Sequence, residues 1–318
     1  MTRFCFTLLL LIFLLPALAQ ENIYNSFYVP ADLKKNANTV KREEKILFEI
    51  KTKNKAYYTV HKVITVLSEA GKNELLFYEF TDKFVSLEEV AIELFDSKGV
   101  SQNKYRKEDL YKQAAGDGLV PDGKIYIKQL SVLKYPVTVR IDYTLKFNGI
   151  LNYPDYRVQI PDQAVENSDY TARVPAELDL RYKPKNTAIV PEISVDGKTK
   201  IYKWKVSHLP ALADETGTVS RESRYPTVLL APNKFELDGY EGDMSSWQNF
   251  GYWYGNLAKD AINLTEERKQ FFIALVKNAR RQHDASQLDS QREPERHRLL
   301  RRRRKRAGHL TVLSRRVS

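Results

Sequence analysis

The sequence contains one cysteine, Cys5, and that residue lies inside an apolar run near the N-terminus. Residues 1–19 combine a basic Arg3, an apolar run from Phe4 to Leu15 and the small residues Ala17 and Ala19, a pattern typical of a secretory signal peptide. Its removal would leave no cysteine. We therefore expect an exported chain, periplasmic or on the cell surface, with no disulfide, thiolate metal ligand or cysteine nucleophile.

Long apolar runs and catalytic motifs are also missing. The run from Phe4 to Leu15 is shorter than the roughly 20 residues that span a bilayer, so no transmembrane span is expected. The sequence has no Gly-rich phosphate loop, no GxSxG and no HExxH. We predict no catalytic, cofactor-binding or metal-binding residue, and no cofactor.

The C-terminal region, from Arg280, has no aromatic residue and no isoleucine. It contains 12 Arg and 1 Lys, whereas residues 1–279 contain 10 Arg and 28 Lys. The break interrupts a helical pattern whose apolar stripe, at Phe271, Phe272, Leu275 and Val276, should pack on something downstream. A shifted reading frame or a fused gene end would produce this change, and we predict a disordered, out-of-frame tail over 280–318. A polybasic arm for phosphate or anionic lipid is the alternative.

The net charge of +11 does not indicate a nucleic-acid-binding fold. The tail has 13 basic and 4 acidic residues, so it accounts for +9, and only +2 remains for residues 1–279. A nucleic-acid-binding domain needs a basic folded surface, and we expect no specific nucleic-acid partner.

Apolar residues alternate with polar ones from Lys45 to about Leu237, which predicts β-strands. The clearest example is VTVRIDYTLKF, in which Val137, Val139, Ile141, Tyr143, Leu145 and Phe147 share one face. The dipeptide Asp196-Gly197 predicts a tight hairpin turn. Many short antiparallel strands predict a mainly β protein with a β-sandwich-like N-terminal region.

Helical spacing begins after about residue 240. In SSWQNFGYWYGNLAKD, the residues Trp247, Phe250, Tyr254 and Leu257 recur at intervals of three and four. Ser245 with Gln248 fits a capping box. Thr265 predicts a second helix start, with Glu266 and Glu267 favourably placed in its first turn.

The remaining polar candidates are predicted to be structural. His61 and His208 have no ligand-like partner in nearby sequence, and Asp117 with Asp122 lacks the ligand pattern of a calcium loop. The adjacent pairs Glu43–Glu44 and Glu88–Glu89 should point to opposite faces of a strand, so they form no carboxylate dyad. Asn263-Leu264-Thr265 is a glycosylation pattern, but a helix start explains it.

Five aromatic residues offer two interpretations. Tyr57, Tyr58, Tyr126, Tyr202 and Trp204 could line a carbohydrate platform, because sugar faces stack on aromatic rings. Aromatic residues are also the ordinary fillers of a sandwich core, and period two turns half of them inward. The core interpretation is favoured.

The order of a signal peptide, strands including VTVRIDYTLKF, the stretch RYPTVLLAP, the segment SSWQNFGYWYGNL and a further helix resembles a known family. These are exported bacterial transglutaminase-like proteins with an N-terminal β domain, the domain of unknown function 3857. The resemblance covers about residues 22–279. It implies a β platform before a papain-like core with a Cys, His and Asp triad. The sequence departs from that pattern, since no cysteine follows Cys5, and His283, His297 and His309 match nothing in it.

The predicted organisation is therefore a signal peptide (1–19), a β-sandwich domain (20–240), the first helices of an incomplete α+β transglutaminase-like core (241–279) and the Arg-rich tail (280–318). The favoured function is a non-catalytic platform for a missing papain-like core, so we do not expect an enzyme. Two alternatives stay open: a periplasmic β-sandwich module that binds peptide or glycan, and a secreted protein that binds anionic surfaces through its tail.

Overall fold

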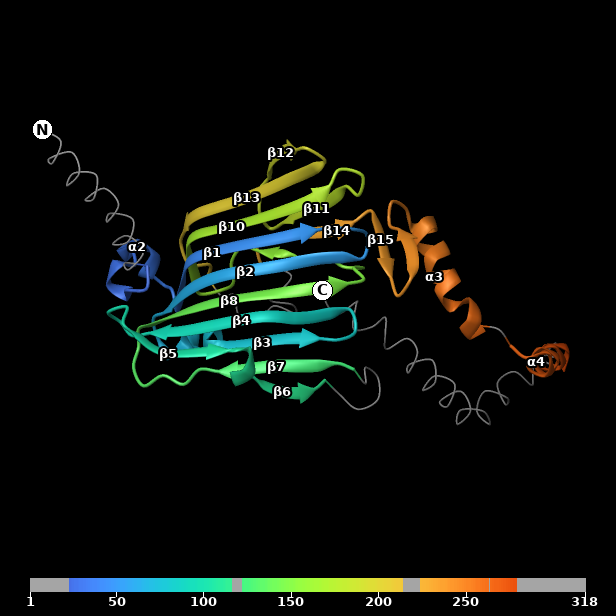
Figure 1. The fold of residues 1–318 in the computed structure, drawn as a ribbon, viewed down its shortest axis with the longest axis horizontal. Helices are drawn as coiled ribbons and strands as arrows, with labels where there is room; N and C mark the ends of the chain where they lie inside the picture. Colours follow the sequence, from blue (N-terminus) through green and yellow to red (C-terminus); the bar gives the residue numbers. More distant parts are fainter. Residues whose placement is uncertain (1–22, 116–121, 214–223, 263, 279–318) are drawn as a thin grey trace, which may run out of the picture.

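The segments with period two form β-strands, as predicted, because alternate side chains of a strand point to opposite faces. The structure is a computed structural model that describes residues 23–115, 122–213, 224–262 and 264–278. The described part is mainly β, with one large sheet, three small ones and a few helices (Figure 1).

The large sheet contains eight strands (Figure 1). In spatial order they are β12 (Glu192–Asp196), β13 (Thr199–Leu209), β10 (Gln163–Pro175), β1 (Thr39–Ile50), β2 (Lys55–Val66), β8 (Val137–Asn148), β4 (Val85–Phe95) and β5 (Ser101–Arg106). Neighbours pair antiparallel except β1 and β10, which are parallel. The parallel pair departs from the antiparallel prediction. Periodicity cannot reveal it, because β10 follows β1 only after eight other strands, β2 to β9.

The small sheets complete the sandwich. They are β3 (Leu76–Thr81), β7 (Lys124–Gln129) and β6 (Tyr111–Ala114); β11 (Leu180–Lys185), β14 (Thr227–Pro232) and β9 (Tyr156–Arg157); and the hairpin β15 (Lys234–Leu237) with β16 (Tyr240–Asp243). One apolar core joins the large sheet to the first two of them. Phe77 of β3 and Tyr156 of β9, for example, contact Tyr143 and Tyr170 of the large sheet, respectively. The predicted sandwich-like packing is therefore confirmed.

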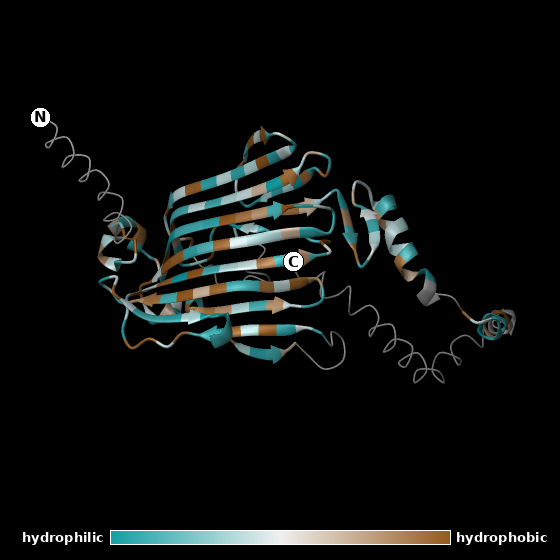
Figure 2. Cartoon of the chain, in the orientation of Figure 1, coloured by the Kyte–Doolittle hydropathy of each residue, from teal (hydrophilic) through white to brown (hydrophobic). Residues whose placement is uncertain are grey.

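The other face of the large sheet is polar over most of its area. Figure 2 shows hydrophilic and hydrophobic residues alternating along its strands. The alternation predicted for β8 is confirmed, with Val139, Ile141 and Leu145 in the core. At one end of the strands, however, both faces are buried, because residues 23–38 cover it. Tyr24 stacks on Phe95 with ring centroids 4.2 Å apart, and Leu33 is buried against Val40.

Two tight turns have the Asp-Gly sequence. Gly197, with a φ of 58°, follows Asp196 between β12 and β13, as predicted. Asp238 and Gly239, with φ of 55° and 83°, join β15 to β16. Asp238 and Gly239 are the two central residues of their turn, and positive φ at both is the geometry that Asp-Gly favours in a two-residue hairpin. In the first turn Asp196 pairs with Thr199, so the central residues are Gly197 and Lys198. The second turn was not predicted, although the same dipeptide marks it.

Four short helical elements precede the two long helices in the described residues. They are the 3-10 helices Ser26–Tyr28, Glu69–Leu75 and Lys107–Asp109, and the short helix α2 (Ala31–Lys34). The long helices are α3 (Trp247–Ile262) and α4 (Glu266–Asn278). α2 lies at one end of the large sheet and α3 at the other (Figure 1).

The predicted start of α3 is corrected by one residue. Asn249 N donates to Ser246 Oγ at 3.1 Å, so Ser246 rather than Ser245 caps the helix. Ser245 instead accepts from the side chain of Asn249. The start of α4 is as predicted, since Arg268 N donates to Thr265 Oγ1.

Candidate functional site

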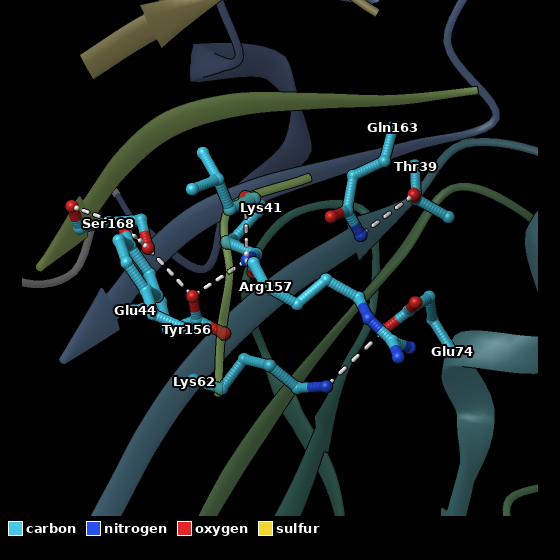
Figure 3. Close-up of polar contacts among 10 residues, drawn as sticks. Thr39, Lys41, Glu44, Lys62, Glu74, Tyr156, Arg157, Gln163 and Ser168 are labelled. Atoms are coloured by element: carbon cyan, nitrogen blue, oxygen red, sulfur yellow. Dashed lines mark hydrogen bonds and ion pairs between the residues drawn. The ribbon is translucent and has the colours of Figure 1, made fainter. Parts of the chain in front are cut away.

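The most unusual chemistry in the described structure is a cluster of charged side chains inside the sandwich (Figure 3). A register shift in β1 between Lys41 and Glu43 turns Lys41 and Glu44 to the same, inner face. Lys41 Nζ donates to Glu44 Oε2 at 2.7 Å and to the Val158 carbonyl at 3.2 Å. Only 4% of Lys41 and 7% of Glu44 is exposed. The bulge therefore creates a buried ion pair.

Two hydroxyls extend this ion pair across three strands. Ser168 Oγ of β10 donates to Glu44 Oε2 at 2.7 Å, and Tyr156 Oη of β9 donates to Ser168 Oγ at 2.8 Å. Burial raises the pKa of Tyr156, which keeps the phenol protonated and able to donate. We call Lys41, Glu44, Tyr156 and Ser168 the ionic clamp. Because β9 belongs to a small sheet, the clamp ties that sheet to the large one (Figure 3).

Lys62 and Glu74 form a second pair near the clamp, at 3.4 Å (Figure 3). Burial alone would lower the pKa of Lys62, but the negative field of Glu74 and Glu44 raises it, so the ammonium stays charged. Gln163 donates to Thr39 Oγ1 at 3.4 Å at the end of the same region. These groups satisfy one another's hydrogen bonds, which is the arrangement of a structural polar core.

The polar face of the large sheet carries a network centred on His61. His61 Nδ1 lies 2.5 Å from Asp142 Oδ1, and His61 Nε2 lies 3.2 Å from Glu43 Oε2. Hydrogen bonding to Asp142 raises the pKa of His61, although partial burial opposes it. Arg140 bridges Asp142 to Glu93, at 3.0 and 2.9 Å. Sequence spacing could not find these partners, because strand register brings them from β1, β2, β4 and β8.

A polar cleft separates the β15–β16 hairpin from the end of the large sheet. Its volume is about 460 Å³, and it is lined by Asn54, Lys55, Lys83, Phe84, Asn148, Gly149, Glu236, Asp238 and Gly239. Asn54 donates to Glu236 at 2.9 Å, and Lys83 pairs with Asp238 at 2.7 Å. These contacts bridge the cleft and hold the hairpin on the sheet.

The other histidine in the described residues, His208, pairs with Asp32 at 2.5 Å, and both are exposed. This contact ties α2 to β13. Asp122 accepts from Lys83 N at 2.8 Å, which is a loop contact, while Asp117 lies outside the described residues. Asn263, His283, His297 and His309 also lie outside them, as do the predicted signal peptide (1–19) and the Arg-rich tail (280–318).

The two carboxylate pairs behave differently. Glu43 faces the polar side and Glu44 the core, so the prediction of opposite faces is confirmed there. It is wrong for Glu88 and Glu89, which are both exposed, because a register shift between Leu87 and Glu89 inserts Glu88 as a bulge.

The core interpretation of the five aromatic residues is confirmed for four of them. Trp204 and Tyr202 are buried, and Tyr58 and Tyr126 pack against the same core. They cannot share an exposed platform with Tyr57, which lies on the polar face beside Lys55.

Neither a metal cluster nor a membrane-spanning helix occurs in the part of the chain that the structure describes. No three His, Cys, Asp or Glu side chains among these residues are placed to hold a metal ion. None of the described helices is both long and apolar enough to cross a bilayer.

The model of the family DUF3857, described as a domain of unknown function with a solved structure, matches residues 52–213. The chain belongs to this family. The match covers every strand of the large sheet except β1. It includes Tyr156 and Ser168 of the ionic clamp but not Lys41 and Glu44. No curated protein matches the sequence.

Solved structures match this chain at low sequence identity. A putative protease from Parabacteroides distasonis is 12% identical, with a TM-score of 0.52, over 61% of this chain. This chain covers 40% of that protein. An M1 zinc metallopeptidase from Deinococcus radiodurans (6% identity, TM-score 0.32, 61% of this chain and 42% of that one) and a putative nutrient binding protein from Legionella pneumophila (8%, 0.30, 62% and 68%) also match. The first of these likenesses concerns the fold alone.

Proposed function

We propose that this chain is an exported, non-catalytic β platform for a transglutaminase-like core of the papain type. Membership of the DUF3857 family supports the platform, and the sequence resemblance to transglutaminase-like proteins supports the core. The similar structure of a putative protease, of which this chain covers 40%, agrees with a β domain that forms one part of a larger protein.

The observation that carries the proposal is the two-sided helix α3. One side packs on the hairpin, where Trp253 contacts Phe235 with ring centroids 4.9 Å apart. Outside this contact the helix exposes Trp247, which is 89% exposed, and Tyr252, which is 73% exposed. Exposed aromatic residues of this size are typical of a surface that another domain covers. In this proposal, the papain-like core covers it.

The absence of catalysis rests on chemistry. A papain-type reaction requires a thiolate beside a histidine, and Cys5 lies in the predicted signal peptide. The partners of His61 are carboxylates, Asp142 and Glu43, which orient an imidazole but cannot attack an amide carbonyl. Ser245 and Ser246 are occupied at the start of α3.

The reading frame provides the first test. We propose that the composition changes at Arg280 because the frame shifts there, so the nucleotide sequence should encode a Lys-, Tyr- and Ile-containing continuation in another frame. That continuation should include a cysteine followed by His and Asp. A gene with no such continuation in either alternative frame would contradict this part of the proposal.

An activity assay provides the second test. The secreted chain should not hydrolyse amides, incorporate amines or crosslink proteins, and iodoacetamide should not label it. The frame-restored protein is the matched comparison, and it should be labelled at its new cysteine. Crosslinking or peptidase activity that stays with the present chain through purification would refute the proposal.

The covered face of α3 can be tested in the frame-restored protein. Replacing Trp247 and Tyr252 with alanine should lower the melting temperature of the core, because both rings would lose a buried contact. Tyr28→Ala is the control, since Tyr28 is exposed and comes shortly before α2, which lies at the opposite end of the sheet. Equal melting temperatures for the unsubstituted protein, the Trp247 and Tyr252 variant and the Tyr28 control would show that the core does not pack on α3.

A further inference from the structure

The solvent face of the small sheet β3–β7–β6 is apolar, unlike the solvent face of the large sheet. Its register aligns Tyr78, Ile127 and Tyr111 in one row across the three strands, and Phe80 beside Ile125 in the next. Leu76 completes the set. Tyr78 is 53% and Tyr111 66% exposed. We call these six residues the apolar strip; its sheet lies at the lower edge of the molecule in Figure 1.

The strip is not part of the core. The alternate residues of the same strands face inward, where Phe77 contacts Tyr143 and Tyr126 packs on the main cluster. Phe80, Ile125 and Ile127 are only partly buried and do not belong to that cluster. Strand alternation therefore turns the strip toward solvent.

The strip also lacks charge. Its two remaining outward positions are Gln113 and Gln129, which carry neutral amides. Outward positions of the large sheet instead carry ion pairs such as Lys203–Asp169 and Arg173–Glu49. A charged ligand would lose hydration on the strip without gaining an opposite charge, so the surface suits a neutral ligand.

The size of the strip limits the partner. Three strands about 4.8 Å apart, with about five residues of each, cover roughly 250 Å². A stable protein interface needs about 800 Å² from each partner, so the strip alone is too small for a lasting dimer. Tyr78 and Tyr111 are two strands apart, or about 10 Å, which exceeds the width of one sugar ring and suits a short chain of them.

We propose that the apolar strip binds an uncharged oligosaccharide. The pyranose faces, which present C–H groups, stack on Tyr78 and Tyr111 across Ile127. The Gln129 amide nitrogen donates to the Leu75 and Leu130 carbonyls, so at the margin the Gln113 amide, the Gln129 side-chain oxygen and the two phenols supply hydrogen bonds to sugar hydroxyls. This site is separate from the aromatic helix α3, so it goes beyond the platform role.

The test is isothermal titration of the full chain with neutral tetrasaccharides to hexasaccharides of glucose, xylose, galactose and N-acetylglucosamine. At least one should bind, and Tyr78→Ala and Tyr111→Ala should each weaken that binding about tenfold, because each removes one stacking ring. Tyr57→Ala is the matched control: it removes a tyrosine from the charged face of the large sheet and should leave affinity unchanged.

Each other outcome overturns the proposal. Failure of every oligosaccharide to bind refutes it, as does binding that the strip variants leave intact. Sedimentation of the same proteins tests whether the strip binds a second copy of the chain instead. A dimer that Tyr78→Ala or Tyr111→Ala dissociates would show this and overturn the proposal. Circular dichroism of the variants confirms that both exposed substitutions leave the fold intact.

Discussion

At the scale of single residues, one extra residue in β1 determines which side chains of this strand face the core. Without the bulge, Lys41 and Glu44 would lie on opposite faces of the strand, because three positions separate them. The bulge turns both inward and places Arg42 on the opposite face of the strand, where it is buried and contacts Glu166 and the Asn25 carbonyl. The result is a charged group in the core on one side and an anchor for the N-terminal segment on the other.

Breaking the ionic clamp from one side should be costly. We predict that Glu44→Leu lowers the free energy of unfolding by about 3–5 kcal/mol, because it leaves the Lys41 ammonium buried without its counter-charge. The double variant Lys41→Met with Glu44→Leu should recover most of this loss. Urea denaturation measures both. Lys45→Ala, which removes an exposed ammonium from the same strand, should change stability by less than about 1 kcal/mol. A double variant no better than Glu44→Leu would contradict the role of the pair.

His61 should make stability depend on pH. Its pKa in the folded protein is raised above the ordinary value of about 6.5, chiefly by Asp142. The protonated ring therefore stabilises the fold fully below about pH 6.5, and this stabilisation is lost as the pH rises through the raised pKa. We predict that His61→Gln lowers the free energy of unfolding at pH 5 and has less effect at pH 8. Denaturation at pH 5 and pH 8 measures both effects. A larger loss of unfolding free energy at pH 8 than at pH 5 would contradict the raised pKa of His61. His208→Gln, at an exposed pair, is the control.

At the scale of elements, α3 is held by a small apolar cluster around Phe235 and Trp253. Gly242 of β16 makes this cluster possible, because a Cβ there would lie 2.2 Å from Phe235 Cζ. The end of the Phe235 ring thus occupies the space that a side chain at position 242 would need, and the ring packs edge-to-face with Trp253. Trp253 is the residue through which the helix is anchored.

Displacing Phe235 should release the helix. We predict that Gly242→Ala forces this ring aside and loosens α3, which hydrogen exchange would show as faster exchange across residues 247–259. The core strands β1, β2 and β8 should exchange as before, because their contacts are elsewhere. Gly251→Ala is the matched control, since a Cβ at Gly251 has nothing within 4 Å. Unchanged exchange in α3 would show that the cluster tolerates the methyl group.

Elements were predictable from sequence where periodicity was strong. β8 and the Asp196-Gly197 turn follow directly from alternation and from turn chemistry. The parallel pairing of β1 with β10 does not, because it depends on the return path of the chain. The ionic clamp was missed for the same reason: Lys41, Tyr156 and Ser168 meet only after that pairing. The sequence shows that Lys41 and Glu44 are three residues apart, but it does not show the bulge that turns both side chains to the same face.

At the scale of the whole molecule, the large sheet is closed at both ends in different ways. Residues 23–38 cover one end and bury Val29 and Leu33 almost completely. The hairpin and α3 close the other end, where Trp253 is the one helix residue that is fully buried among those described. Residues 23–38 are therefore more deeply integrated than the two long helices.

This difference predicts how truncation affects the fold. A chain from Glu21 to Asp243 lacks both long helices, yet it keeps the main core, the ionic clamp and the N-terminal cover. It should remain soluble and mainly β by circular dichroism, be indifferent to reductant, and lose only the contacts of the small cluster around Trp253. A chain that starts at Thr39 and is otherwise full length should lose more stability, because it uncovers Val40, Ala164 and Phe95 and leaves Arg42 without its carbonyl partner. Thermal denaturation of the two shortened chains compares them directly. A higher melting temperature for the chain that lacks residues 21–38 would show that the helices, rather than the N-terminal segment, complete the sandwich.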